Sequence, residues 1–286
     1  GILAQSVGGG GGAVISTGGA VTPTFKAGSG NASAVTVNVN ASITTTGAGA
    51  HGVVAQSVRG GGGLVTNGTT TVMQGGTSGS SGLVKVNVAS GVKIVATGQG
   101  AVGIKTWSST DPIVNIAAGA SVVGGTGGSA LEFEGPTNEL NNSGAVGSVD
   151  GADGAAVRTI SGDTTVNNSG TLQGNIHLAK EGSNLVHNLG TGTLVAGSTL
   201  DLGDGGLLRN DGTLASGIAA GSTTRITGSL EQSASGVLNL RVDHANARVD
   251  TFEVSGSAQL LGSLRPTLVN GGLVAPGTVA LGSFLH

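Results

Sequence analysis

A long internal repeat constrains the fold of this chain more than any other feature of its sequence. Residues 1–12 (GILAQSVGGGGG) and 52–63 (GVVAQSVRGGGG) are identical at nine of twelve positions and lie 51 residues apart. A weaker third copy follows after another 51 residues, at 103–108, where Trp107 takes the place of Gln56. Self-similarity at a fixed period indicates a chain built from stacked units.

A second element lies between these copies and reads Val-Asn-Val or Val-Asn-Ile, with its asparagine at Asn38, Asn87 and Asn115. Each example is followed by a small-residue turn and a further apolar stretch. Stacking of the element places the three asparagines either in an exposed polar row or in an inward amide ladder. Both arrangements stay open, and the three residues are candidates for an interaction surface.

The repeat shortens after about residue 140, where a polar corner is followed by Gly-Thr-Leu or a relative of it. The corner glycines stand at positions 144, 170, 192, 212 and 236, so their spacings are 26, 22, 20 and 24 residues. Short apolar alternations bounded by Gly, Ser, Asn or Asp indicate short strands. A unit of this length holds about three strands, and it must stack on its neighbours to bury its apolar side.

These patterns predict an all-β fold, a right-handed parallel β-helix (a solenoid) of roughly a dozen coils. We interpret the 51-residue spacing as a double coil and the spacing of 20–26 residues as a single coil. Composition agrees, because 57 of the 286 residues are Gly while aromatic residues make up 2% and charged residues 9%. A thin rod has room for stacked small and β-branched side chains but for few large rings. A sandwich or barrel would show hairpin turns and more aromatic residues.

The change of repeat predicts three segments. Gly-rich repeats occupy 1–131, shorter coils occupy 132–235, and a capping, autochaperone-like segment occupies 236–286. Basic residues prevail in the first segment and acidic residues prevail after it. The candidate capping residues, which we expect to close the open end of the stack, are Phe252, Leu260 and Leu264.

Several functions are excluded by composition and by missing motifs. The net charge of −3 does not indicate the basic surface that binding of nucleic acid requires. The absence of Cys removes thiolate metal sites and Cys nucleophiles. No P-loop, G-x-S-x-G or calcium-binding nonapeptide pattern occurs, so we expect no cofactor, no metal and no catalytic residue. The carboxylate pairs Glu132 with Glu134 and Asp201 with Asp204 keep a carbohydrate-active enzyme as an alternative.

Three further residues carry weak signals. His177 and His187 lie ten residues apart, which is a poor metal signal because two histidines alone do not complete a site. Trp107 is the only Trp of the chain. Its ring is either an anchor for a ligand or a filler at a joint between coils.

The order of these motifs resembles the passenger regions of bacterial autotransporters, the type V secretion proteins. The AQSxGGGG repeat at 4–12 and 55–63 resembles a repeat of those passengers, and 167–176 (NNSGTLQGNI) and 207–218 (LLRNDGTLASGI) resemble their C-terminal coils. Residues 236–268 resemble the pertactin-like end of the stalk. The resemblance implies a β-helix exported through the periplasm and outer membrane of a Gram-negative bacterium, to be displayed on the cell surface or secreted. It also implies, as a partner during secretion, the chain's own C-terminal outer-membrane β-barrel, and we expect this chain to be a fragment or processed product without it.

The expected function is therefore that of a non-enzymatic structural stalk in adhesion or self-association, such as cell aggregation, biofilm formation or host attachment in virulence. Its expected partners are other cells, surface ligands or further copies of the chain. Two alternatives remain: a passive display or folding scaffold for an upstream domain, and a carbohydrate-active β-helix enzyme.

Overall fold

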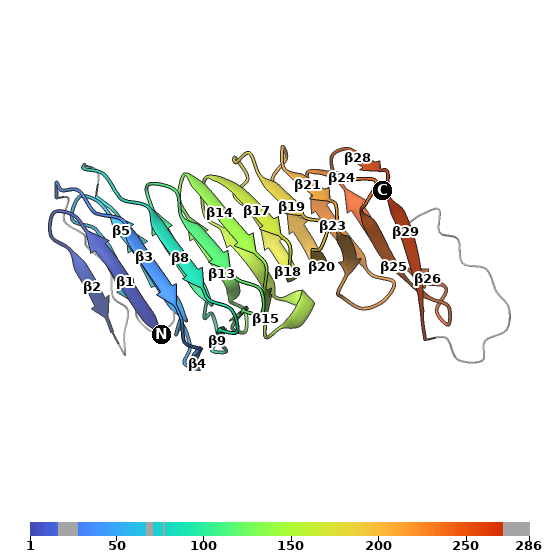
Figure 1. Ribbon diagram of the computed structural model, residues 1–286, viewed down its shortest axis with the longest axis horizontal. Coiled ribbons are helices and arrows are strands. Elements are labelled where there is room, and N and C mark those ends of the chain that lie inside the picture. Colours follow the sequence, from blue (N-terminus) through green and yellow to red (C-terminus); the bar gives the residue numbers. More distant parts are fainter. Residues whose placement is uncertain (17–27, 67–70, 77, 271–286) are drawn as a thin grey trace.

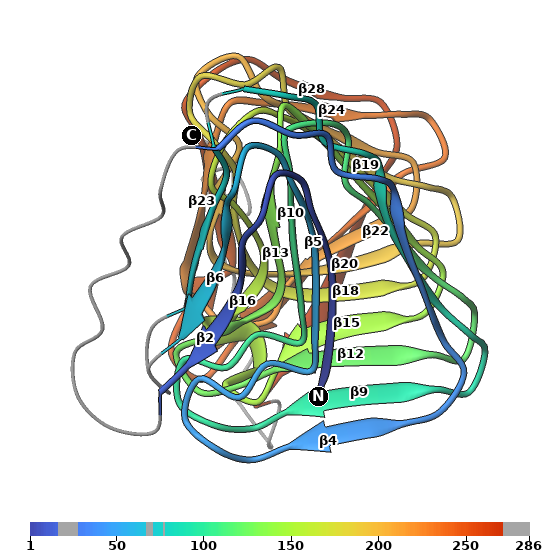
Figure 2. The same cartoon turned by 90° about the vertical axis from the view of Figure 1, so that its left-hand side faces the viewer.

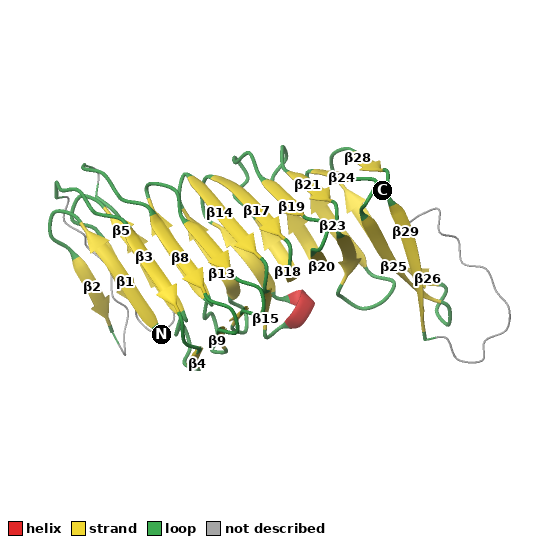
Figure 3. Cartoon of the chain, in the orientation of Figure 1, coloured by secondary structure: helices red, strands yellow, loops and turns green. Residues whose placement is uncertain are grey.

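The structure is a computed structural model, and it describes residues 1–16, 28–66, 71–76 and 78–270. The molecule is all-β, with 56% of the described residues in strands (Figure 3). The helical structure in these residues is a single 3-10 turn, η1 (Gly151–Asp153). No helix in the described ranges has the length and hydrophobicity needed to cross a lipid bilayer.

Parallel strands are stacked in long rows that run the length of the molecule (Figure 1). One sheet contains nine strands, and we name its outer surface the amide face. Its strands, in spatial order, are β3 (Val35–Val39), β8 (Val84–Val88), β11 (Ile113–Ile116), β14 (Thr137–Asn142), β17 (Asp163–Asn168), β19 (Leu185–Asn188), β21 (Leu207–Asn210), β24 (Ser229–Gln232) and β28 (Ala258–Leu260).

A larger sheet of 17 strands contains two further stacks, because β18 (Thr171–His177) and β20 (Thr193–Asp201) each pass through both. The remaining strand, β26 (Arg248–Val249), pairs antiparallel with β25 and belongs to neither stack. The second face is formed by β4 (Ile43–Thr45), β9 (Lys93–Ala96), β12 (Ser121–Gly124), β15 (Ala145–Ser148), the first halves of β18 and β20, β22 (Thr213–Ser216), β25 (Val237–Asp243) and β29 (Ser263–Val269). The charged face is formed by β1 (Ile2–Val7), β5 (Val53–Val58), β10 (Ile104–Ser108), β13 (Ser129–Glu134), β16 (Ala155–Thr159), the second halves of β18 and β20, β23 (Thr223–Thr227) and β27 (Thr251–Val254).

Successive strands of the chain belong in turn to the amide, second and charged faces, and this order repeats along the chain. We call each set of three such strands a layer. Seen from the end, the layers surround a three-sided interior (Figure 2). Alternate residues of each strand point inward, as in β8, where Val84, Val86 and Val88 are buried between partly exposed residues. These side chains join one hydrophobic core that continues through the layers, and its largest members are Phe133 and Phe252.

Close stacking explains the periodic glycines better than turn conformation does. Gly212 has an ordinary backbone conformation, but a Cβ there would overlap the backbone oxygens of Gly192 and Leu189 in the neighbouring layer. In the glycine run at 60–63, a Cβ on Gly62 would overlap the backbone of Gln74 and Gly75. Glycine is therefore required where backbones of different segments meet without room for a side chain.

The recurrence of Ala-Gln-Ser in the long repeat also has a structural cause. Gln56 and Ser57 are fully buried. The Gln56 Nε2 donates to the Gly63 carbonyl at 3.0 Å and the Ser57 Oγ donates to the Ser33 carbonyl at 2.9 Å. The equivalent Gln5 donates to the Gln56 Oε1 at 2.6 Å. The AQS segments thus hold neighbouring loops together.

The 51-residue spacing corresponds to one layer, so the interpretation as a double coil is wrong. β1 pairs directly with β5, and β5 pairs directly with β10, both with an offset of 51 residues. Part of the additional residues lies outside the three stacks and forms a small separate sheet of β2 (Gly12–Ile15), β6 (Gly63–Thr66) and β7 (Thr71–Gln74), which we call the excursion. This excursion also lowers the number of layers, and the amide face counts nine strands where roughly a dozen coils were expected.

The expected segment boundaries are not structural breaks. The boundary between 131 and 132 falls inside β13, and β25 pairs with the preceding β22 across the boundary at 235. Strands β27, β28 and β29 extend all three stacks by one more layer. Residues 271–286 of the expected capping segment lie outside the described residues.

Two of the three candidate capping residues are integrated into this last layer. Phe252 is fully buried in the common core, and Leu260 packs against that core. Leu264 is 39% exposed, and its neighbours Leu261 and Leu268 are more exposed still. Leu264 lies in β29, where it is in register with Leu238 of β25, so it belongs to the last described strand of the second face.

The excursion at the start of the chain covers part of the charged face. Strands β6 and β7 form an antiparallel pair, and Leu64 and Met73 pack on Val54 of β5. Trp107 of β10 packs against this small cluster, and Gly75 touches its ring. The structure thus places Trp107 as a filler beneath the excursion, the second of the two roles considered above.

Candidate functional site

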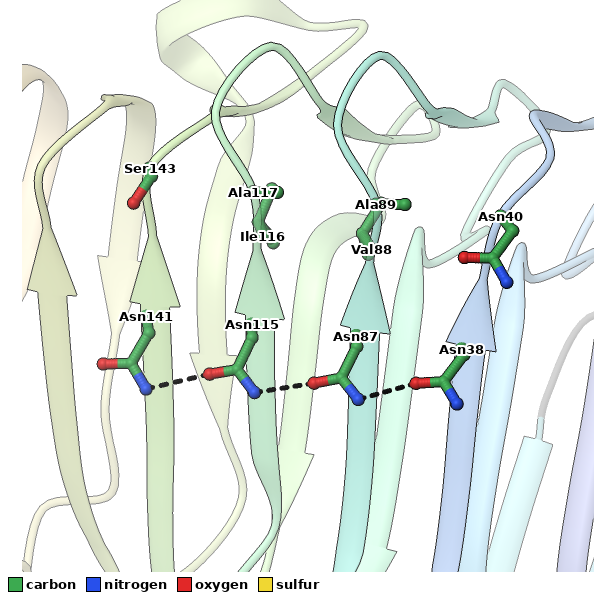
Figure 4. A pocket seen from close by; sticks show the side chains of 10 residues that line it. All are labelled: Asn38, Asn40, Asn87, Val88, Ala89, Asn115, Ile116, Ala117, Asn141 and Ser143. Atoms are coloured by element: carbon green, nitrogen blue, oxygen red, sulfur yellow. Dashed lines mark hydrogen bonds between the residues drawn. The ribbon is translucent and has the colours of Figure 1, made fainter.

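An outward-facing row of amides runs along the amide face, with its first residue exposed and the others partly buried. In-register pairing of β3, β8, β11, β14 and β17 stacks five asparagines, Asn38, Asn87, Asn115, Asn141 and Asn167. Each amide nitrogen donates to the oxygen of the preceding asparagine, with donor–acceptor distances of 2.8, 2.8, 3.0 and 3.0 Å. Figure 4 shows the first four residues of this outer amide row. Of the two arrangements open from the sequence, Asn38, Asn87 and Asn115 adopt the exposed one.

The outer amide row presents a regular neutral surface. An asparagine amide has two N–H donors and an oxygen with two lone pairs, and the row itself uses one donor and one lone pair of an internal member. Asn141 also donates to the Glu139 carboxylate at 2.7 Å, so its second donor is already used. A shallow depression of about 530 Å³ lies beside the row and is lined by several of its residues together with Val88, Ala89 and Ser143 (Figure 4). Such a surface can form repeated hydrogen bonds without any ionic contribution.

A second amide row, the inner amide row, points into the molecule; it begins one residue after the outer row in β14 and β17 and continues through β19, β21 and β24. Its members Asn142, Asn168, Asn188 and Asn210 are at most 1% exposed, and Gln232 continues the row. Each nitrogen of these asparagines donates to the next side-chain oxygen, at 2.8, 2.8, 2.8 and 3.4 Å. It also donates to a backbone carbonyl at the following corner, for example from Asn188 to Thr213 at 3.0 Å. This row is a structural seam that satisfies the backbone at the corners.

Asn141 and Asn167 were missed from the sequence because their strands depart from Val-Asn-Val. Each is the first residue of an Asn-Asn pair, whose second residue belongs to the inner row. The double asparagine before a Ser-Gly corner is the signal that could have identified both rows. Beyond Asn167 the outer position is taken by His187, Arg209 and Glu231.

This continuation is an ionic cluster instead of an amide row. The His187 Nε2 lies 2.6 Å from an Asp211 carboxylate oxygen, and the Arg209 Nε lies 3.5 Å from the other oxygen. Hydrogen bonds from His187 and Ser233 lower the pKa of the Asp211 carboxyl. Since the cluster is partly solvated, its contribution to stability is small.

A second candidate site lies on the charged face. In-register pairing of β10, β13, β16, β18 and β20 places Lys105, Glu132, Arg158, His177 and Asp201 in one row. Lys105 forms an ion pair with Glu132, and both side chains are only 11–12% exposed. The Arg158 Nη1 lies 4.0 Å from the other Glu132 oxygen, and its side chain is 57% exposed. The row contains both basic and acidic side chains, and the acidic Glu132 lies between the basic Lys105 and Arg158.

This row forms the floor of a groove beside the excursion, which we call the hairpin groove. One part, of about 500 Å³, lies between β7 and the row and includes His51, Val72, Glu134 and Ile160. An adjoining part, of about 540 Å³, extends to His177, and both parts include Glu132 and Arg158. The size is within the range of small-molecule sites.

Burial alters the titration of three side chains at the groove. Burial, reinforced by the charge of Lys105, lowers the pKa of His51 to about 4. The ring is held by the Val102 N–H, which donates to Nδ1 at 3.0 Å, and by Thr71, 2.9 Å from Nε2. Burial raises the pKa of Glu134, against the opposing hydrogen bond from Trp107, and burial lowers the pKa of His177.

The sequence identified Glu132 with Glu134 as a carboxylate pair but not the basic residues beside it. Both carboxylates line the hairpin groove. Asp201 lies at the end of the row, away from its candidate partner Asp204, which stands in a turn. His177 and His187 lie on different faces, the charged face and the amide face, so they share no site. No group of three or more His, Asp or Glu able to hold a metal occurs in the described part of the chain.

Comparison with known proteins adds no assignment. No family model matches the chain, and no curated protein and no solved structure matches it either.

Proposed function

We propose that the chain is a right-handed parallel β-helix and forms the stalk of an autotransporter-type passenger that acts in adhesion or self-association. Three stacks of parallel strands visited in constant order support the β-helix. The right hand follows because parallel crossover connections are almost always right-handed. The resemblance of the AQSxGGGG and Gly-Thr-Leu motifs to autotransporter passengers supports export to the cell surface.

The observation that carries the functional proposal is the outer amide row. Five stacked amides repeat at the strand spacing of about 4.8 Å and leave hydrogen-bonding groups directed outward. A single amide contact with a partner is weak, because water competes for the same groups. A row of identical contacts on a rod engages together, and many rods on one cell multiply the effect through avidity. Since the groups are neutral, the association is insensitive to salt.

The test is the aggregation of cells that display the chain in its full export context. The triple variant Asn87→Ala, Asn115→Ala and Asn141→Ala removes the centre of the outer amide row. Its matched control is Thr171→Val, Thr193→Val and Thr213→Val, which removes three polar groups of one register row on the second face. We expect the asparagine variant to stay in suspension and the threonine variant to settle like the wild type, at 0.05 and at 0.5 M NaCl.

Equal settling of both variants, at equal surface display, contradicts a binding role for the row. The chain is then a passive display scaffold, and its contribution to adhesion comes from other parts of the protein.

A further inference from the structure

Among the described residues that line the hairpin groove, Arg158 is a cation that the protein pairs only weakly. Lys105 is engaged with Glu132 in a nearly buried pair. Arg158 has only the distant contact of 4.0 Å to the same carboxylate, and more than half of its side chain is exposed. A guanidinium offers five N–H donors in a planar fork that matches a carboxylate in two parallel hydrogen bonds. Arg158 is thus the accessible cation of the groove, and the partly buried Glu134 carboxylate lines the same groove.

Groups around Arg158 limit how much negative charge a ligand can carry. Glu134 faces the groove on one side, and Asp201 follows His177 in the row on the other. A ligand with closely spaced anionic groups would place some of them against these carboxylates, which is unfavourable. A single carboxylate on an otherwise neutral ligand avoids this repulsion.

The rest of the groove suits a ligand with both hydroxyl groups and apolar patches. Val72 on β7 and Ile160 after β16 are 38% and 45% exposed, and both line the groove. The Thr71 hydroxyl oxygen and the Glu132 carboxylate also line the groove; both have protein partners, but an oxygen keeps further lone pairs that can accept from a sugar hydroxyl. Sugar rings have this mixed character, since their C–H faces are apolar and their edges carry hydroxyl groups.

We propose that the hairpin groove binds a glycan that ends in an acidic sugar, with the sugar carboxylate on Arg158 and its ring between Val72 and Ile160. This site goes beyond the stalk function proposed above and uses none of the residues of the outer amide row. It gives the rod a specific ligand on the charged face, in addition to nonspecific contacts between rods.

The experiment measures binding of three trisaccharides to the full chain by calorimetry and by saturation-transfer NMR. The probes are a lactose core ending in sialic acid, the same core ending in glucuronic acid, and a neutral trisaccharide of the same size. We expect an acidic probe to bind, the neutral probe to bind at least tenfold more weakly, and 0.5 M NaCl to weaken the acidic probe. The two acidic probes identify which acid is preferred. Equal binding of neutral and acidic probes, or no binding of any probe, overturns the proposal.

Two pairs of variants make the test specific. Arg158→Gln is compared with Arg209→Gln, because Arg209 is 51% exposed and has a similarly long ion pair on the amide face. Ile160→Asp is compared with Val149→Asp, since Val149 is 44% exposed and does not line the groove. We expect each groove variant to weaken binding at least tenfold and each control to stay within twofold of the wild type.

Equal loss in a groove variant and its control overturns the proposal. Cells that display Arg158→Gln should still aggregate, because the outer amide row is intact. The two proposals can therefore fail separately.

Discussion

The two amide rows use the same side chain, and in β14 and β17 they occupy neighbouring positions of one strand, yet they have different surroundings. Asn141 and Asn142 are adjacent in β14, and one points to solvent while the other is fully covered. The hydrogen bonds along both rows have nearly the same lengths. The difference lies in what remains after a side chain is removed: water can replace an outer amide, but it cannot reach the partners of an inner one.

Burial, and not hydrogen-bond geometry, therefore decides which row stabilises the fold. Removing a buried partner leaves donors and acceptors unpaired at a cost of about 1–3 kcal/mol each. Removing an exposed partner costs only a few tenths of a kcal/mol up to about 1 kcal/mol. The inner row is then a structural feature, and the outer row is free to serve binding.

The largest effect is expected for Asn188→Ala in the inner row. Asn188 accepts a hydrogen bond from Asn168 and donates to Asn210 and to the Thr213 carbonyl. Its loss leaves several buried groups without partners, so we expect the free energy of unfolding to fall by about 3–4 kcal/mol. Urea denaturation measures this value, and a loss below about 1 kcal/mol would show that the inner row is dispensable.

The amide rows do not ionise, so they do not make the free energy of unfolding depend on pH. His51, which lies beside the excursion, does. The pKa of His51 is about 4 in the folded chain and about 6.5 in the unfolded chain. The unfolded state therefore binds the proton first, and stability is lost as the pH falls from about 6.5 to about 4. The expected loss is about 2–3 kcal/mol.

The matched variant for this titration is His51→Asn, which keeps an acceptor for Val102 and a donor for Thr71 but does not titrate. Urea denaturation between pH 7 and pH 4 should show a flatter profile for the variant. Identical slopes for both proteins would mean that His51 is solvated in the folded chain.

The corner glycines provide a smaller test of close stacking. Gly212→Ala introduces a methyl group against the backbone of the neighbouring layer, and we expect a loss of about 2 kcal/mol. Gly205→Ala is the control, because Gly205 has an ordinary backbone conformation and a methyl group there would meet nothing within 4 Å. If thermal unfolding shows the same shift for both variants, steric overlap is not the reason for glycine at this corner.

The smallest effect on stability is expected for Asn115→Ala in the outer row. It removes hydrogen bonds to Asn87 and Asn141 at a partly exposed, outward-facing position, where water can replace the amide. We expect less than about 1 kcal/mol by urea denaturation. A loss comparable to that of Asn188→Ala would remove the distinction between the two rows.

Periodicity allowed the sequence to predict the all-β fold, the parallel stacking and the recurrence of Asn38, Asn87 and Asn115. It could not reveal that a 51-residue spacing is one layer, because the excursion through β6 and β7 adds length without adding a layer. The sequence also could not predict the row of Lys105, Glu132, Arg158 and His177. Its members are separated by unequal lengths of chain, so only the strand register brings them together.

Sedimentation equilibrium of the purified chain tests the role of the outer amide row most directly. The wild type and the variant Thr171→Val, Thr193→Val, Thr213→Val should both associate as their concentration rises. The variant Asn87→Ala, Asn115→Ala, Asn141→Ala should remain monomeric while its urea midpoint stays close to that of the wild type. Association of this asparagine variant at the same concentration as the wild type would contradict a binding role for the row.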